Sequence, residues 1–188
     1  DLSAEAESAK TLIDAGCVLI SQHADSMGAP STCEEAGVPN VSYNASTIGA
    51  GPNTYIISSR INWEPYFEYM IQCVQNGEAI DVDWTGTIAT SSVELAELNE
   101  AVAAPGTAEA IEAAKAALQA GTLHVFETAN FTVGGETLTE YLADVDTDEA
   151  YTGDTNVILD GYFNESEFRS APYFDVQIDG ITLLDSAY

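Results

Sequence analysis

The sequence predicts an α/β protein built around a parallel β-sheet, and three observations lead to this fold class. Short apolar runs alternate with amphipathic segments that begin at capping residues and end at glycine. Polar loops follow the apolar runs, as they do at the carboxyl edge of a parallel sheet. With 188 residues, 46% of them hydrophobic, the chain is long enough to bury a sizeable core.

The first predicted elements are a helix and a buried strand. Ser3 is a candidate N-cap and Gly16 a stop, which predicts a helix over residues 4–15. The apolar run 17–20 is typical of a strand that is buried on both faces of a sheet. Because a parallel βα chain ordinarily opens with a strand, we expect the first strand of this sheet to lie upstream.

Alternating units continue through the first half of the chain. We expect a short helix over 31–36 and strands over 40–43 and 54–57, with a polar loop after each strand. An amphipathic helix is predicted over 63–76, with Asn62 as its N-cap and an apolar stripe along one face.

The second half holds fewer regular elements. Strands are expected over 84–88, 93–95 and 123–126, and an Ala-rich helix runs from Thr107 to a stop at Gly121. The last third is rich in turns, and its hairpin signals are Gly134-Gly135, Asp179-Gly180 and, before the latter, the alternating Phe174, Val176 and Ile178.

The charge balance of the chain is extreme. Four Lys and Arg residues stand against 31 Asp and Glu residues, which gives a net charge of −27. Such a charge repels phosphate backbones, so it excludes nucleic acid as a partner. We interpret the acidity as a solubilising surface, and neutral or cationic ligands suit it better than phosphorylated ones.

Neither a metal site nor a cofactor is expected, and we predict that the chain is not an enzyme. The two histidines, His23 and His124, cannot form a zinc cluster, and no nucleophile motif accompanies them. The three cysteines lack a CxxC spacing and are interpreted as small buried hydrophobes, although two of them could pair in an oxidising compartment.

Three polar loops are expected at one edge of the sheet, where open α/β proteins bind ligands. The first contains His23, Asp25 and Ser26, whose side chains can hydrogen-bond a small polar molecule. The alternative is a solvated loop in which Asp25 caps the following turn. The second loop contains Asn44, and the third ends at Trp63, which could stack on a heterocycle or pack as an ordinary core aromatic.

These loops resemble motifs of the BMP (basic membrane protein) family, the substrate-binding lipoproteins of purine-nucleoside-type ABC importers. The family shows a Gln-His-Thr-Asp-Ser loop, a Gly-Tyr-Asn-Ser-Asp segment and a Thr-Ser-x-x-Trp-Asn-Trp-Gly-Pro-Tyr-Tyr segment. The counterparts here are Gln22-His23-Ala24-Asp25-Ser26, Ser42-Tyr43-Asn44-Ala45-Ser46 and Ser58-Ser59-Arg60-Ile61-Asn62-Trp63-Glu64-Pro65-Tyr66-Phe67. A further family segment, Gly-x-Leu-His-Val-Phe, is similar to Gly121-Thr122-Leu123-His124-Val125-Phe126.

The resemblance covers about residues 1–140 and implies a type I periplasmic-binding-protein fold, with a Rossmann-like parallel sheet and helices on both of its faces. Residues 1–130 would then form mainly the C-terminal ligand-binding lobe, with the 63–76 helix crossing toward the other lobe. Residues 131–188 would form a turn-rich extension with β-hairpins. The N-terminal lobe and the first strand would be missing from this chain.

The resemblance also implies a function. A purine nucleoside would be held between two lobes and delivered to an ABC permease, outside the cytoplasm, by a protein attached to the membrane through an upstream lipid anchor. The ligand-binding residues would be His23, Asp25, Ser26, Asn44, Ser46 and Trp63.

One departure from the family leaves the ligand open: Ser46 stands where the family has an aspartate, so a carboxylate of the ribose-recognition scheme is lost. Another small solute, such as a sugar, a furanose signal or a vitamin, is therefore an alternative. A structural or interaction domain that has lost its ligand is a second alternative.

Overall fold

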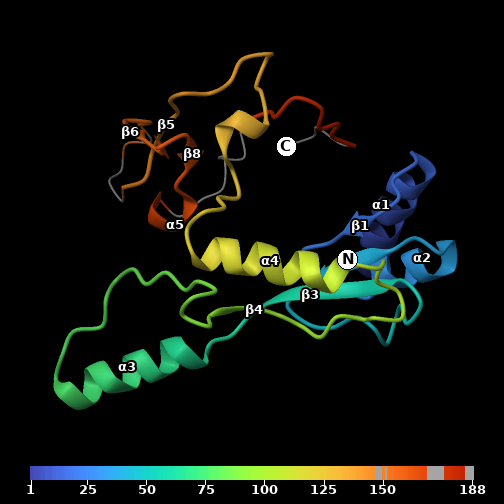
Figure 1. Ribbon diagram of the computed structural model, residues 1–188, viewed down its shortest axis with the longest axis horizontal. Helices are drawn as coiled ribbons and strands as arrows, with labels where there is room; N and C mark the ends of the chain where they lie inside the picture. Colours follow the sequence, from blue (N-terminus) through green and yellow to red (C-terminus); the bar gives the residue numbers. More distant parts are fainter. Residues whose placement is uncertain (147–149, 151, 169–175, 185–188) are drawn as a thin grey trace. The chain divides into compact units, whose positions relative to one another are not determined.

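The computed structural model describes residues 1–146, 150, 152–168 and 176–184, which belong to two compact units (Figure 1). The first unit comprises Asp1–Gln119 and the second Ala120–Tyr188. Each unit has a hydrophobic core of its own, as separate domains do.

A four-stranded sheet organises the first unit. Its strands lie in the order β1 (Ile20–Ser21), β2 (Asn40–Tyr43), β3 (Tyr55–Ile61) and β4 (Val93–Leu95). The first three strands are parallel, and β4 pairs antiparallel with β3. The parallel α/β core predicted from the sequence is confirmed, with one antiparallel strand added at its edge.

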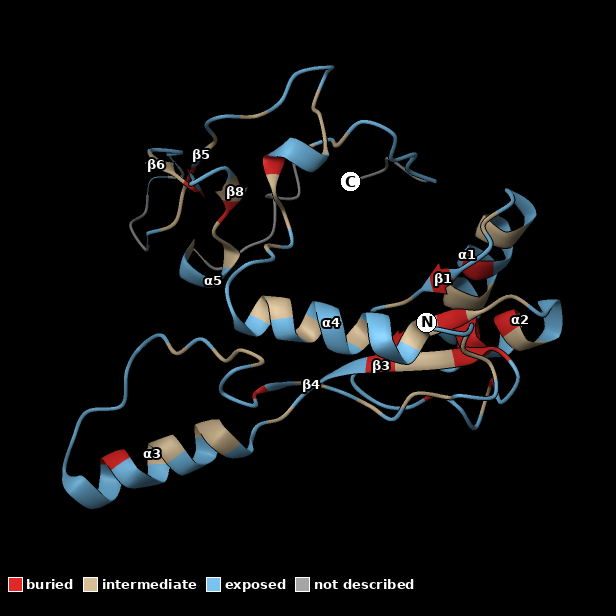
Figure 2. Ribbon diagram, in the orientation of Figure 1, coloured by how far each residue is buried: buried red, intermediate tan, exposed pale blue. Residues whose placement is uncertain are grey.

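Two helices, α1 (Leu2–Asp14) and α2 (Gly28–Ala36), pack against each other and against one face of this sheet. The buried residues in Figure 2 gather where these helices meet the strands. The apolar core there consists of Ala9, Ile20, Ala29 and Cys33. Burial raises the pKa of the Cys33 thiol, because the thiolate would lose its hydration.

The ends of these helices differ in part from the prediction. Asp1, and not Ser3, is the N-cap of α1: its carboxylate accepts a hydrogen bond from the Ser3 backbone N–H at 2.9 Å. The Asp1 carboxylate, unlike a serine hydroxyl, also places negative charge at the positive end of the helix dipole. α2 begins at Gly28, earlier than predicted, and ends at Gly37, whose φ of 69° is left-handed.

The predicted strand over 17–20 is wrong in extent. Only Ile20 of this run belongs to β1, and Val18 and Leu19 are 82% and 50% exposed. β1 lies at the edge of the sheet, so the residues that lead into it are not covered on both faces. β3 is longer than predicted and continues to Ile61, because β4 pairs with its second half.

Residues 84–88 are not a strand, which corrects the prediction. The backbone N–H groups of Thr87 and Thr90 each donate to the other residue's hydroxyl, at 2.8 and 3.3 Å. The Thr87 carbonyl accepts from the backbone N–H of Ser92 at 3.0 Å. These local hydrogen bonds use backbone groups that would otherwise pair with a neighbouring strand.

Two further helices belong to the first unit, as predicted. The N-cap of α3 (Glu64–Asn76) is Trp63, one residue later than the predicted Asn62, and the Asn62 side-chain oxygen accepts from the Glu64 N–H at 3.2 Å. The helix ends at Gly77, which has a φ of 72°. α4 (Thr107–Gln119) has no buried residue.

The second unit is built from short pieces. They are a 3-10 helix η1 (Thr128–Asn130), the paired strands β5 (Leu142–Ala143) and β6 (Thr155–Asn156), the paired strands β7 (Ile158–Leu159) and β8 (Tyr162–Phe163), and helix α5 (Glu165–Phe168). Its buried core consists of Ala143, Val157, Ile158 and Phe163.

The segment 123–126 is not a strand, contrary to the prediction. His124 stacks on Tyr162 with the ring centroids 3.6 Å apart, and the Phe126 carbonyl accepts from the Phe163 N–H at 3.1 Å. A ring stack and isolated backbone bonds therefore hold this segment in place of a ladder.

The two hairpin signals of the last third both form turns, and the second of them joins no strands among the described residues. Gly134 and Gly135 have φ values of 61° and 85° and join Val133 to Glu136, which exchange backbone hydrogen bonds. Asp179 and Gly180 form the other turn. The Asp179 carboxylate accepts hydrogen bonds from the N–H groups of Gly134 and Gly135 and from the Thr132 hydroxyl. Of the alternating residues before this turn, Phe174 lies outside the described residues, and Val176 and Ile178 are not in a strand.

None of the helices in the described residues is long and apolar enough to cross a bilayer. No group of three or more His, Cys, Asp or Glu side chains in the same part of the chain could hold a metal ion. All three cysteines are free thiols.

Candidate site at the carboxyl edge of the sheet

The carboxyl ends of the three parallel strands meet at one edge of the sheet, as the sequence predicted. Ser21 pairs with Val41, Val41 with Ile57, and Tyr43 with Ser59. The loops after β1 and β2 therefore leave from the same edge. The third loop is shorter than predicted, because residues 58–61 belong to β3.

A cavity of about 460 Å³ lies along this edge. It is lined by side chains on the carboxyl halves of β1, β2 and β3, by the first residues after β1, and by one residue of β4. The lining residues are Ser21, Gln22, His23, Val41, Ser42, Tyr43, Ile57, Ser59 and Leu95.

An aromatic stack forms one wall of the cavity. The imidazole of His23 lies on the ring of Tyr43, with the centroids 4.1 Å apart and the planes 15° from parallel. Parallel stacking at this distance presents a flat surface built from two neighbouring strands. His23 is the one predicted ligand-binding residue that lines this cavity.

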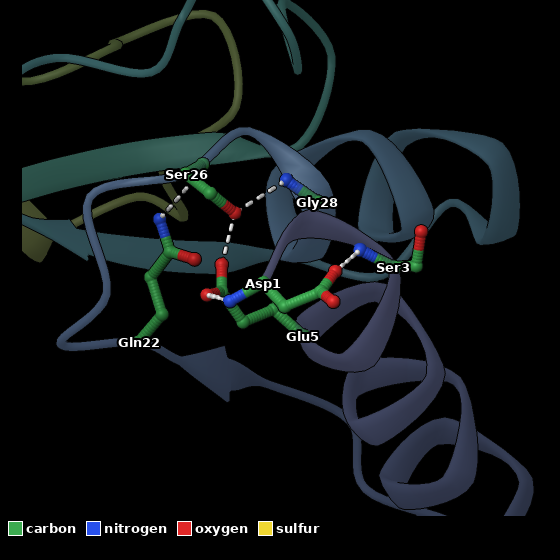
Figure 3. A network of polar contacts seen from close by, with 6 residues as sticks. All are labelled: Asp1, Ser3, Glu5, Gln22, Ser26 and Gly28. Atoms are coloured by element: carbon green, nitrogen blue, oxygen red, sulfur yellow. Dashed lines mark hydrogen bonds and ion pairs between the residues drawn. The ribbon is translucent and has the colours of Figure 1, made fainter.

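The amide of Gln22 lies outside the cavity. Gln22 follows Ile20 by two residues, so its side chain points to the same face of the sheet, which α1 and α2 cover. Its Nε2 donates to the Ser26 carbonyl at 3.3 Å, and its amide lies beside Ser26 in Figure 3. Its Oε1 is buried and has no hydrogen-bond partner among the described residues. A ligand in the cavity would therefore meet His23 and Tyr43 and not the Gln22 amide.

The Ser26 hydroxyl is hydrogen-bonded to α1 and α2, and Ser26 does not line the cavity. Its hydroxyl donates to the Glu5 carboxylate and accepts from the Gly28 N–H at 3.1 Å (Figure 3). The Asp1 ammonium group also donates to Glu5, at 2.9 Å. The hydrogen bond from Ser26 and the one from the N-terminus lower the pKa of the Glu5 carboxyl. Ser26 thus links the start of α2 to the first turn of α1.

Asp25 lies exposed on the same loop and is not among the residues that line the cavity. Within the described part of the chain its carboxylate has neither a hydrogen bond nor an ion pair. The alternative that Asp25 caps the next turn is therefore wrong, since Ser26 holds the Gly28 N–H.

Asn44 and Ser46 lie on the loop after β2 and are exposed. Asn44 has a φ of 68°, and its backbone N–H donates to the Ser59 carbonyl at 2.6 Å. Asparagine tolerates this left-handed conformation better than most residues. The Ser46 hydroxyl accepts from the Ile48 N–H at 3.4 Å. Neither residue lines the cavity.

Trp63 lies elsewhere in the first unit. It is 56% exposed, packs near Tyr66 and Phe67, and lines a different pocket. The structure therefore does not bring the six predicted residues together in one cavity.

The sheet-edge cavity is suited to binding an uncharged polar molecule. Hydroxyl groups line it together with the His23–Tyr43 stack and the apolar side chains of Val41, Ile57 and Leu95. Its lining contains no Lys, Arg, Asp or Glu. Such a mixture of apolar surface and a few polar groups is typical of small-molecule sites.

Two known proteins are similar to parts of this chain. No family model matches the chain. The putative ABC transporter glucose-binding protein TsgA13 of Haloferax volcanii is 33% identical over 81 residues, which are 43% of this chain and 21% of that protein. A solved structure, an ABC transporter solute-binding protein from Conexibacter woesei, superposes with a TM-score of 0.52.

The chain is similar to solute-binding proteins of ABC transporters. The likeness to the Conexibacter woesei structure has 19% sequence identity and covers 66% of this chain and 42% of that one, and it shows a shared fold. The chain thus spans about a fifth of the curated relative and less than half of the solved structure.

Proposed function

We propose that this chain is part of the extracytoplasmic solute-binding component of an ABC importer, and that its ligand rests in the sheet-edge cavity. The observation that carries the proposal is the His23–Tyr43 stack, which forms a flat wall of the cavity. The similarity to two solute-binding proteins supports the same assignment.

The proposed ligand is a purine nucleoside. The flat face of the His23–Tyr43 stack suits a heterocycle, and the hydroxyls of Ser21 and Ser59 suit the hydroxyls of a ribose. The absence of cationic side chains from the lining, together with the net charge of −27, favours a nucleoside over a nucleotide.

A sugar is the second candidate, and the name of the Haloferax volcanii relative favours it. A pyranose also presents hydroxyls to a polar lining and an apolar face to an aromatic ring. Ser46, which stands in place of the carboxylate of the nucleoside-binding family, does not line the cavity and so does not decide between the two ligands.

In this proposal the described cavity is one wall of a larger site. Residues 1–130 act mainly as the C-terminal lobe of a type I binding protein, and α3 extends toward a second lobe. Closure of two lobes around the ligand would then form the surface that an ABC permease recognises.

Calorimetric titration of a protein that carries this chain together with the second lobe tests the proposal, with adenosine, guanosine, inosine, glucose and adenosine monophosphate as ligands. We expect binding of an uncharged nucleoside or of glucose, and weaker binding of the monophosphate. The His23→Ala variant should bind about tenfold more weakly, since the ligand loses part of its stacking surface. His124→Ala, the same change in the second unit, is the matched control.

The outcomes separate the two ligands. Binding of glucose and of no nucleoside would show that the ligand is a sugar. Equal affinity of the parent and His23→Ala proteins, or binding of none of the five compounds, would refute the site.

A further inference from the structure

A second pocket of the first unit carries chemistry that the sheet-edge site does not use. It has a volume of about 430 Å³ and lies between the end of β3, the start of α3 and the segment before β4. Its lining residues are Ile61, Asn62, Trp63, Tyr66, Asp81, Val82, Asp83, Trp84, Gly86, Ser92 and Val93.

Three aromatic rings surround this pocket. Tyr66 lies 6.4 Å from Trp63 and 5.2 Å from Trp84 between ring centroids, with planes inclined by 65° and 45°. All three rings line the pocket, and a cation within about 6 Å of the face of an aromatic ring is attracted by its π system. This arrangement differs from the flat, parallel stack of the sheet-edge cavity.

The charges around the rings are negative. Asp81 and Asp83 are exposed and line the pocket, and its lining contains neither Lys nor Arg. The Asp81 backbone N–H donates to the Tyr69 hydroxyl at 3.0 Å, which holds the segment against α3. A cation in this pocket would therefore gain both from the rings and from the carboxylates.

Ser92 is an independent indication of a ligand. It is 4% exposed and lines the pocket, and its Oγ has no hydrogen-bond partner among the described residues. A buried hydroxyl without a partner is uncommon in folded proteins, and a ligand that carries an N–H or O–H group would satisfy it.

Gly86 keeps this space open. A Cβ at position 86 would lie against the Ser92 side chain and 2.9 Å from the Cζ3 atom of Trp84. Any larger residue would therefore push apart the two side chains that bound the pocket on this side.

We propose that this pocket is a second binding site of the chain, and that it takes a small organic ammonium ion with a hydroxyl or N–H group. The rings and carboxylates hold the ammonium group, and Ser92 receives the hydroxyl or N–H. The site is separate from the sheet-edge cavity and does not depend on the function proposed for that cavity.

Intrinsic fluorescence provides a direct readout, because Trp63 and Trp84 are the two tryptophans of the whole chain. The 188-residue chain is titrated with choline and, in parallel, with its uncharged isostere 3,3-dimethylbutan-1-ol. We expect choline to change the tryptophan emission in a saturable way and the isostere to bind about tenfold more weakly.

Matched variants locate the effect. Asp81→Asn/Asp83→Asn should weaken choline binding by about tenfold at low salt, since two attractive charges are removed. Glu7→Gln/Glu35→Gln removes the same net charge from α1 and α2 and should leave the affinity at the parent value. Gly86→Ala should abolish binding, and its unchanged far-ultraviolet circular dichroism would show that the unit still folds.

The proposal fails on three results. It fails if choline causes no saturable change, if the uncharged isostere binds as tightly as choline, or if the Glu7/Glu35 control weakens binding as much as the Asp81/Asp83 variant does. The last result would mean that net charge alone attracts the ion. None of these results bears on nucleoside or sugar binding at the sheet edge.

Discussion

Gly28, the first residue of α2, lies directly against the carbonyl oxygen of Leu2, the first residue of α1. A Cβ at position 28 would meet this oxygen and would lie 3.2 Å from the Ala6 backbone nitrogen. The close packing of the two helices therefore depends on glycine at this position.

Gly28→Ala should destabilise the first unit by about 1–3 kcal/mol, the usual effect of overpacking against backbone atoms. Gly49→Ala is the control, because a Cβ at position 49 would meet nothing within 4 Å. Urea denaturation followed by circular dichroism measures both variants. Equal midpoints for the two variants would show that α1 can move aside.

Ser26→Ala should lower the stability of the first unit by about 1 kcal/mol, the usual effect of losing a cap-like side chain. The variant loses the hydrogen bonds to Glu5 and Gly28 that join α1 to α2. Ligand affinity at the sheet edge should stay at the parent value, which calorimetry can measure beside a thermal melt.

Asp25→Ala should weaken ligand binding and leave stability unchanged if the exposed Asp25 carboxylate reaches a ligand. We expect stability within about 0.5 kcal/mol of the parent, since the side chain has no partner in the described structure. A large loss of stability with unchanged affinity would remove Asp25 from the proposed site.

Acid should weaken the link between α2 and the segment before β3. Hydrogen bonds from Asn53 and Thr54 lower the pKa of the Glu34 carboxyl below its ordinary value of 4.5. A lowered folded-state pKa means that this stabilisation is present above pH 4.5 and is lost as the pH falls through the folded-state value.

The Glu34→Gln variant isolates this contribution. The difference in unfolding midpoint between parent and variant should be largest near neutral pH and should shrink below about pH 4. Glu35→Gln, on the exposed side of α2, is the control for changed net charge. A parent–variant difference that is independent of pH would contradict the assigned role of Glu34.

Salt should stabilise the protein. Lys10, Arg60 and Lys115 already form ion pairs, so most of the 31 acidic residues repel one another without compensation. Raising KCl from about 0.1 M to about 1 M shortens the Debye length from roughly 10 Å to roughly 3 Å and should raise the Tm. Sucrose of equal osmolality is the control, and an equal rise in Tm with sucrose would assign the effect to surface exclusion.

The edge of β1 should favour self-association of the 188-residue chain. β1 is an edge strand of the sheet, and Val18 and Leu19 beside it are 82% and 50% exposed. Light scattering in about 1 M salt, where charge repulsion is screened, should show a species larger than a monomer. Val18→Lys should shift it toward the monomer, whereas a monomeric parent would contradict the expectation.

Local signals allowed much of the fold to be predicted. The strand over 40–43, the helix that follows Asn62 and the turn at Gly134-Gly135 depend on capping, periodicity and left-handed glycine within a few residues. The strand predicted over 84–88 failed because Thr87 and Thr90 bond to each other, a competition that apolar alternation does not reveal.

The candidate site was predictable in position and only partly in composition. A polar loop after a buried strand placed His23 at the sheet edge, since parallel strands end together. The role of Ser26 was not predictable, because its partner Glu5 lies 21 residues away on another helix. The burial of the Gln22 Oε1 outside the cavity was not predictable either, since burial depends on the surrounding elements.

The sequence by itself determined the α/β class, the acidic surface, the position of the polar loops and most helix ends. These properties follow from composition and from interactions between residues that are close in the chain. Only the tertiary structure decided which side chains share a cavity: it stacked His23 on Tyr43, and it placed Trp63 with Trp84 in a separate pocket. The physical reason is that strand pairing and helix packing bring distant residues together, and hydrogen bonding and burial act only once they are adjacent.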